Sequence, residues 1–182
     1  MPKFKLEMQA EIYRKDGTLR KQYPWKPINS LLKNFILTLA CQLAQAGQTM
    51  TDTTGNVRAN IAAIRNFDAN AAAATTTYGL VIGTGENAVT LADTKLQTQV
   101  VTNIGHGIHS FLVENPDAAT CRIAVTRVFT NSTGATLSIA EVGLYVIGTA
   151  NLWKFCIDRA LYSVSVPNGE NLSLTYRNTI TL

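Results

Sequence analysis

Hydrophobic and polar residues alternate at the start of the chain, which is the pattern of a half-buried β-strand. Phe4, Leu6 and Met8 are separated by lysine and glutamate, and side chains two positions apart in a strand share one face. An Asp16-Gly17 pair follows, and this dipeptide is a strong signal for a tight hairpin turn. The pattern predicts a β-hairpin over residues 3–23.

A helical period replaces the alternation in the next segment. Apolar residues recur at helical spacing from Leu31 to Leu43. Ser30 is suited to capping the first turn, and Gly47 is suited to ending the helix. We therefore expect one amphipathic helix over about residues 30–45, with its apolar face packed on a sheet.

Residues 46–77 show no strong period and are rich in threonine, alanine and asparagine. A plain loop of this length is uncommon in a compact domain. We expect an extended loop excursion, with a hairpin turning at Thr54-Gly55, that could reach a neighbouring subunit.

Short alternating strands separated by turn residues fill the rest of the chain. Gly143 is expected at a bulge, and Pro167-Asn168-Gly169 at the tight turn of a last hairpin. A short helical turn is expected at Asp93. The chain is therefore predicted to be mainly β: a jelly-roll-like antiparallel β-sandwich over residues 29–182, preceded by a basic N-terminal hairpin or arm over residues 1–28.

The net charge of +4 is concentrated at the N-terminus. Residues 1–33 hold eight basic and three acidic side chains, or +5, and the other 149 residues hold eight and nine, or −1. A basic segment on a near-neutral body is typical of contact with an acidic surface. The alternative is a solvated hairpin whose lysines prevent edge-to-edge strand pairing. The candidate partner-contact residues are Lys3, Lys5, Arg14, Lys15, Arg20, Lys21, Trp25, Lys26, Thr54 and Arg58.

Aromatic residues among these basic positions could stack on nucleic-acid bases. We expect instead that Tyr23 and Trp25 pack the hairpin onto the body or onto a protein partner, so nucleic acid is not an expected partner. The longest apolar run is too short to span a bilayer, and no membrane contact is expected. The three cysteines form no recognisable pairing motif and are expected to be small core residues in a protein made in a reducing cytosol.

Gly83-Thr84-Gly85 begins a G-x-G-x-x-A pattern, which is the spacing of a dinucleotide-binding turn. That turn must open a long helix in a chain of alternating strands and helices, whereas β-type sequence follows here. We expect the glycines to supply positive φ angles and close packing.

His106 and His109 are the only histidines, too few for a zinc site without acidic ligands, and they are expected in a loop or on the surface. The sequence therefore predicts a non-enzymatic protein with no cofactor and no metal.

Several sequence blocks, in order, carry a resemblance to a known class of proteins: "NSLLKNFILTLA", "TDTTGNVR", "YGLVIGTGENAVTLADTKLQTQV", "VTRVFTNSTGATLSIAEVGLYV" and "DRALYSVSVPNGENLSLTYRNTITL". From about residue 28 to the C-terminus, their order and spacing resemble a class of structural virion proteins of tailed bacteriophages. Asn178 departs from that class by interrupting the apolar alternation of the last strand.

The resemblance implies a β-sandwich protein located in the virion and assembled in the cytoplasm of the host bacterium. The first function that we expect is a capsid decoration or cement protein that bridges capsid subunits. The alternative is a tail, neck or fibre component, with a receptor as a possible contact. The expected partners are the major capsid protein or other virion proteins, together with further copies of the chain, for which a trimer is predicted.

Overall fold

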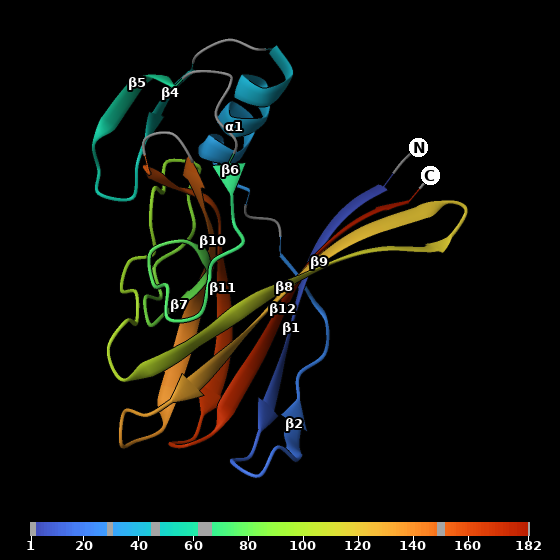
Figure 1. Ribbon diagram of the computed structural model, residues 1–182, viewed down its shortest axis with the longest axis vertical. Helices are drawn as coiled ribbons and strands as arrows, with labels where there is room; N and C mark the ends of the chain where they lie inside the picture. Colours follow the sequence, from blue (N-terminus) through green and yellow to red (C-terminus); the bar gives the residue numbers. More distant parts are fainter. Residues whose placement is uncertain (1–2, 29–30, 45–47, 62–66, 149–151, 182) are drawn as a thin grey trace.

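Strands make up most of the computed structural model, which describes residues 3–28, 31–44, 48–61, 67–148 and 152–181 (Figure 1). The elements, in chain order, are β1 (Lys3–Tyr13), β2 (Leu19–Gln22), β3 (Lys26–Pro27), α1 (Lys33–Ala44), β4 (Gln48–Thr51), β5 (Val57–Ile61), β6 (Phe67–Asp68), β7 (Gly79–Gly83), β8 (Ile104–Asp117), β9 (Thr120–Asn131), β10 (Leu137–Gly148), β11 (Lys154–Val166) and β12 (Asn171–Thr181).

Two antiparallel sheets pack face to face and enclose the main core. The larger sheet has the order β2-β1-β12-β9-β8, with β3 also paired to β1. The smaller sheet has the order β11-β10-β6, with β7 also paired to β10. Alternate residues of the long strands point between the sheets and are buried, among them Met8, Ile12, Val142, Val164 and Leu174. The predicted antiparallel β-sandwich is confirmed.

β1 is an integral strand of the larger sheet rather than part of a detached arm. Its whole length, Lys3–Tyr13, pairs with β12, and Leu6 and Ala10 are buried in the core. The predicted β1–β2 hairpin is present. However, the expected boundary at residue 28 does not separate two bodies, because the first strand supplies part of the core of the second.

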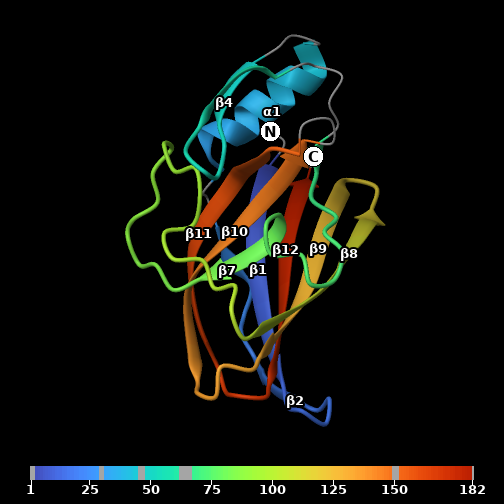
Figure 2. The same ribbon diagram turned by 60° about the vertical axis from the view of Figure 1, so that its left-hand side comes forward.

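α1 lies within the predicted range and packs against β4 and β11 (Figure 2). Ser30 and Gly47, the predicted cap and stop, lie outside the described residues. The buried side of the helix carries Asn34 and Thr38, whereas Leu39, expected in the core, is 43% exposed. No helix in the described part of the chain is long and apolar enough to cross a membrane.

The predicted excursion contains the β4–β5 hairpin, which turns where it was expected. Gly55 has a φ of 87°, which a glycine adopts without strain. The helical turn expected at Asp93 is absent from the described segment between β7 and β8, where Asp93 closes a non-helical turn by accepting hydrogen bonds from Thr90. Register irregularities in β10 flank Gly143, between Ile139 and Glu141 and between Leu144 and Tyr145.

Two turns at one end of the sandwich carry the chain from one sheet to the other. One joins β9 to β10, and the other, Pro167-Asn168-Gly169, joins β11 to β12. The latter is a tight turn with positive φ at Gly169, but it links two sheets and does not close the predicted hairpin. Buried Asn131 holds the two turns together: its side-chain Nδ2 donates to the Val166 carbonyl at 2.8 Å, and its backbone carbonyl accepts from Gly169 N at 2.7 Å.

Candidate functional site

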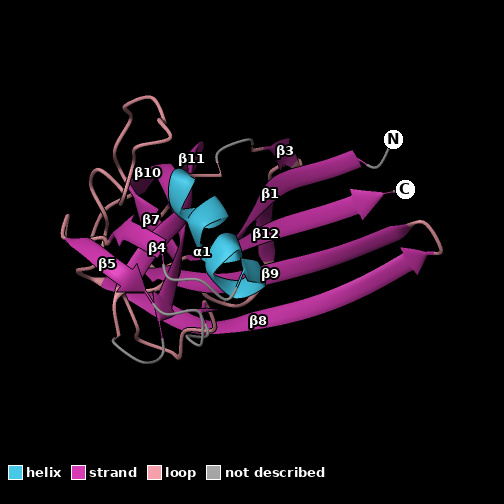
Figure 3. Cartoon of the chain, turned by 90° about the horizontal axis from the view of Figure 1, so that it is seen from above, coloured by secondary structure: helices cyan, strands magenta, loops and turns pink. Residues whose placement is uncertain are grey.

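Four strands of the larger sheet extend beyond the smaller sheet as a flat projection, which we call the wing (Figures 1 and 3). The wing consists of residues 3–7 of β1, 110–117 of β8, 120–125 of β9 and 177–181 of β12. At its base, where it joins the body, Leu6 and Val125 are still buried in the core. Both termini of the described chain and the turn between β8 and β9 lie at its outer end (Figure 3).

The inner face of the wing continues the apolar face that forms the core. Phe4 lies opposite Ile180, and Ile180 lies opposite Cys121; Ile123 lies opposite Val113. These side chains share the strand face of buried core residues such as Met8, Tyr176 and Val125. The smaller sheet does not cover them, so a hydrophobic sheet face stays exposed in the described part of the chain.

The outer face of the wing is charged and internally paired. Glu7 Oε1 lies 2.6 Å from Lys5 Nζ, and Glu7 Oε2 lies 3.0 Å from Arg177 Nη2. Burial alone would raise the pKa of Glu7, but hydrogen bonds from Lys5 and Arg177 hold that pKa below its usual value. The Arg177 guanidinium also stacks 3.7 Å from the centre of the Trp25 ring. Lys5 and Trp25, two predicted contact residues, are therefore tied into the sheet.

The other predicted N-terminal contacts lie away from the wing. Arg14 and Lys15 occupy the exposed turn between β1 and β2, and exposed Arg20 pairs with Glu170 at 2.6 Å. Lys21 lies over the Tyr23 ring and Lys26 over the Tyr162 ring. The backbone of Lys3 pairs with Thr181 in the wing. The structure thus spreads the basic residues along β1, β2 and β3 and does not gather them into one patch.

A hollow of about 260 Å³ lies beside β3 and brings together Trp25, Lys26, two prolines and two tyrosines. The hollow is lined on one side by the segment before β3 and on the other by Tyr162 of β11, which belongs to the opposite sheet. This arrangement agrees with the expectation that Tyr23 and Trp25 pack the N-terminal segment onto the body.

Thr54 and Arg58 support their own hairpin turn. Thr54 donates to Asp52 Oδ1, and Arg58 Nε lies 2.6 Å from Asp52 Oδ2. Although burial opposes it, these hydrogen bonds hold the pKa of Asp52 below its usual value. The Arg58 guanidinium also lies 5.0 Å from the Trp153 ring. Thr54 remains exposed at the turn.

The glycine-rich turn after β7 is built around a buried carboxylate. Glu141 is fully buried and accepts hydrogen bonds from the backbone amides of Gly85, Gln97 and Thr98 at 2.8–3.1 Å. A Cβ atom at Gly83 or Gly85 would lie 2.6 Å from Glu141 Oε1. Close packing therefore explains these glycines, as expected. The predicted positive φ is wrong, since neither is among the positive-φ glycines.

Arg159 completes this cluster with a buried ion pair. Its Nε lies 2.7 Å from Glu141 Oε2, its Nη1 lies 2.7 Å from Asp93 Oδ2, and its Nη2 donates to the Asn87 carbonyl. Burial would lower the pKa of Arg159, but the two carboxylates raise it above its usual value. Glu141 and Arg159 therefore hold the loop between β7 and β8 onto the smaller sheet. The amides that a phosphate would need are already bound to an internal carboxylate.

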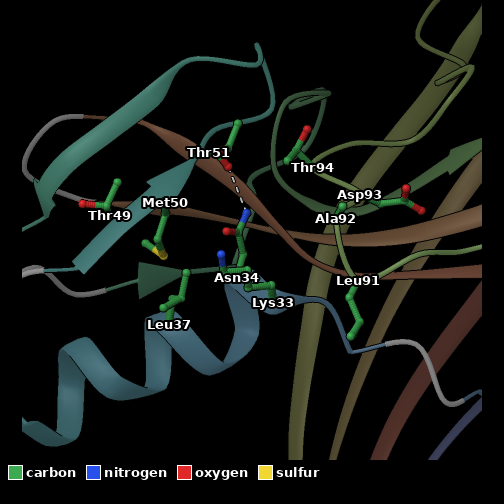
Figure 4. Close-up of a pocket in the computed structure, with 10 residues that line it drawn as sticks. All are labelled: Lys33, Asn34, Leu37, Thr49, Met50, Thr51, Leu91, Ala92, Asp93 and Thr94. Carbon is green, nitrogen blue, oxygen red and sulfur yellow. Dashed lines mark hydrogen bonds between the residues drawn. The ribbon is translucent and has the colours of Figure 1, made fainter.

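A cavity of about 180 Å³ lies between α1, β4 and this loop (Figure 4). Two of its polar side chains are engaged within the protein: Asn34 Nδ2 donates to the Thr51 carbonyl at 2.9 Å, and Asp93 pairs with Arg159. Leu37, Met50 and Leu91 supply much of the remaining wall (Figure 4). The cavity thus lies where the helix and hairpin pack onto the sandwich.

His106 and His109 are buried, which corrects the expectation of loop or surface histidines. A β-bulge between them shifts the register of β8 against β9, so both rings point inward despite their spacing of three. Burial, aided by nearby Arg127, lowers the pKa of His106 to about 4. His109 Nε2 accepts a hydrogen bond from Leu80 N at 2.7 Å. Among the described residues, no cluster of three or more potential metal ligands is present.

Arg127 is a fully buried cation held by backbone carbonyls. Its Nε donates to the Gly107 carbonyl at 2.9 Å, and its Nη1 donates to the Leu80 carbonyl at 2.8 Å. Burial lowers the pKa of Arg127 to about 10, which leaves it charged at neutral pH. Arg127 therefore joins β9 to β7 and β8 and, like Glu141 and Arg159, has a structural role.

Two features escaped the sequence prediction. The buried ion pair had a signal, because Glu141 is the one charged residue within β10. The wing had only an indirect signal, the hydrophobic run Phe111-Leu112-Val113, whose side chains alternate between the two faces. Cys156 is a buried core residue as predicted, but Cys121 is exposed on the wing.

No protein-family model, curated protein or solved structure matches the chain.

Proposed function

We propose that this protein is a non-enzymatic structural component of a tailed-bacteriophage virion, and most specifically a capsid decoration or cement protein. The observation that carries the proposal is the wing. A sheet whose apolar face continues outside its own sandwich is suited to completing its packing against another protein subunit.

The buried charged groups support a structural role. Glu141, Arg159 and Arg127 each bind backbone groups or neighbouring side chains that fix loops on the sheets. Such groups rigidify a scaffold when their hydrogen bonds are satisfied. The ordered sequence blocks that resemble phage virion proteins coincide with these structural parts, since the glycine turn, β10 and β11 meet at the Glu141–Arg159 pair.

The exposed basic side chains of the N-terminal segment, although they are spread over several strands and turns, supply further contacts for an acidic partner. Arg14, Lys15, Lys21 and Lys26 are all exposed. In the proposed role, these residues contact the capsid surface, and the contact is weakened by salt.

Co-sedimentation with phage particles that lack the protein tests the proposal. The purified chain is expected to bind such particles saturably, at many sites distributed over the head. Binding restricted to the tail or neck would favour the alternative of a tail, neck or fibre component. Failure to bind any part of the particle would contradict a virion role.

A further inference from the structure

The inner face of the wing exposes a contiguous hydrophobic surface. Its five large hydrophobic side chains are each 44% to 64% exposed: Phe4, Phe111, Val113, Ile123 and Ile180. With about 180 Å² for each fully exposed large side chain, together they present roughly 450 Å² to solvent. Patches of this size on soluble proteins commonly mark contact surfaces.

No charged side chain lies between the hydrophobic positions of this face. Asn115 and Asp117 lie at its outer tip, where they line a hollow together with Cys121 and Ile180. Asn178 and Cys121 are its polar or weakly polar members, whereas the outer face holds Lys5, Glu7 and Arg177. A two-fold contact places a patch against its own copy, so any charge near the axis would meet a like charge. An uncharged apolar face meets this requirement of self-complementarity, and it offers nothing to an acidic or basic partner.

We propose that the inner faces of two wings pack against each other in a two-fold symmetric dimer of this chain. Each wing would cover the other as the smaller sheet covers the rest of the larger sheet, at the spacing of about 10 Å usual for packed sheets. Because the wing projects away from the body (Figures 1 and 3), a two-fold rotation perpendicular to the strands places the two bodies at opposite ends.

The area of the patch sets the strength of the pairing. The five hydrophobic side chains of both copies would bury roughly 900 Å² in total, and stable interfaces bury about 1,200–2,000 Å². Neighbouring Cys121, Asn178 and the strand backbone add to this area. We therefore expect a dimer that dissociates on dilution. This pairing rests on the proposed assembly role, which it deepens by naming a second copy as the partner, and it differs from the trimer expected from the sequence.

Val113 and Leu112 provide a matched pair of substitutions. They are neighbours on β8, 64% and 52% exposed, and they point to the inner and outer faces respectively, since they pair with Ile123 and Ala124. Neither contributes to the core, so glutamate at either position should leave the fold intact, which thermal denaturation would verify.

Sedimentation velocity over a range of concentrations tests the pairing. The wild-type chain should show a reversible monomer–dimer equilibrium. Val113→Glu should raise the dissociation constant at least ~30-fold, and Leu112→Glu should change it less than ~3-fold. A wild-type chain that stays monomeric, a trimer, or equal weakening by both substitutions would overturn the proposal.

Cys121 offers an independent measure, because its thiol is exposed on the inner face in the single chain. Its alkylation, followed by mass spectrometry of the Cys121 peptide, should slow as wild-type concentration rises and should not slow in Val113→Glu. Alkylation independent of concentration in the wild type would contradict the pairing. A monomeric chain that still binds particles would overturn the dimer alone, and a dimer that binds no particle would overturn the virion role alone.

Discussion

Replacing Glu141 with alanine is expected to lower the free energy of unfolding by about 3–5 kcal/mol, the usual cost of breaking a buried ion pair from one side. Arg159, itself fully buried, would keep only Asp93 as a charged partner. The amides of Gly85, Gln97 and Thr98 would lose their acceptor, and each buried unsatisfied group costs about 1–3 kcal/mol. The unpaired Arg159 and the unsatisfied amides together therefore account for a loss at the upper end of this 3–5 kcal/mol range.

Urea denaturation followed by tryptophan fluorescence measures this loss. With a denaturant slope of about 2 kcal/mol per molar urea, a loss of 4 kcal/mol moves the midpoint by about 2 M. Lys5→Ala is the control, because Lys5 is 56% exposed and Glu7 keeps Arg177 when Lys5 is removed; its cost should stay below about 1 kcal/mol.

A double variant separates the charge from the shape of the site. Replacing both Glu141 and Arg159 with methionine removes the unpaired charge, so the double variant should be more stable than Glu141→Ala. A cost below about 1 kcal/mol for Glu141→Ala would refute the view that this carboxylate holds the loop.

Three further predictions concern pH, glycine positions and surface charge. Since the pKa of His106 falls from 6.5 to about 4 on folding, the unfolded chain takes up the proton first as the pH falls. This uptake by His106 should lower the free energy of unfolding by about 2 kcal/mol between pH 8 and pH 5. The free energy of unfolding of His106→Phe should depend less on pH than that of the wild type. An unchanged pH dependence would show that His106 is not the group responsible. Gly85→Ala should lower the free energy of unfolding by about 3 kcal/mol through overpacking. Gly55→Ala should lower it by only about 1 kcal/mol, because space is open there and the φ of +87° alone causes strain. A larger loss for Gly55→Ala than for Gly85→Ala in urea denaturation would contradict the close packing of Gly85. Lys21→Glu combined with Lys26→Glu should leave the thermal midpoint unchanged and weaken co-sedimentation with particles, and unaltered binding would exclude these residues from the contact.

Local patterns predicted the elements better than their places in the fold. The alternation at Phe4, Leu6 and Met8 identified a strand, because it depends on neighbouring residues alone. Its place in the core sheet depends on pairing with β12, more than 150 residues away along the chain. The sequence therefore predicted an arm where the structure has a core strand.

The histidines show how one local irregularity changes a face. A spacing of three in a regular strand puts His106 and His109 on opposite sides. The bulge between them returns both to the inner side. Gly107, which lies within the bulge, was a signal for it that the prediction did not use. The buried position of Arg127 beside them could not be predicted, since its acceptors are carbonyl groups contributed by β7 and β8.

The wing marks a different limit of sequence patterns. Alternation around Ile123 and Val125 correctly indicates one apolar face. It does not reveal whether the layer that covers this face belongs to the same chain. Val125 is covered by the smaller sheet and Ile123 is not, although the two residues have the same pattern.

Quantitative densitometry of purified virions tests the central claim most directly. A capsid decoration protein should be present in amounts close to those of the major capsid protein, with hundreds of copies in each particle. An amount of a few per cent of the major capsid protein would place the chain in the tail, neck or fibre instead. Its absence from purified particles would contradict a structural role in the virion.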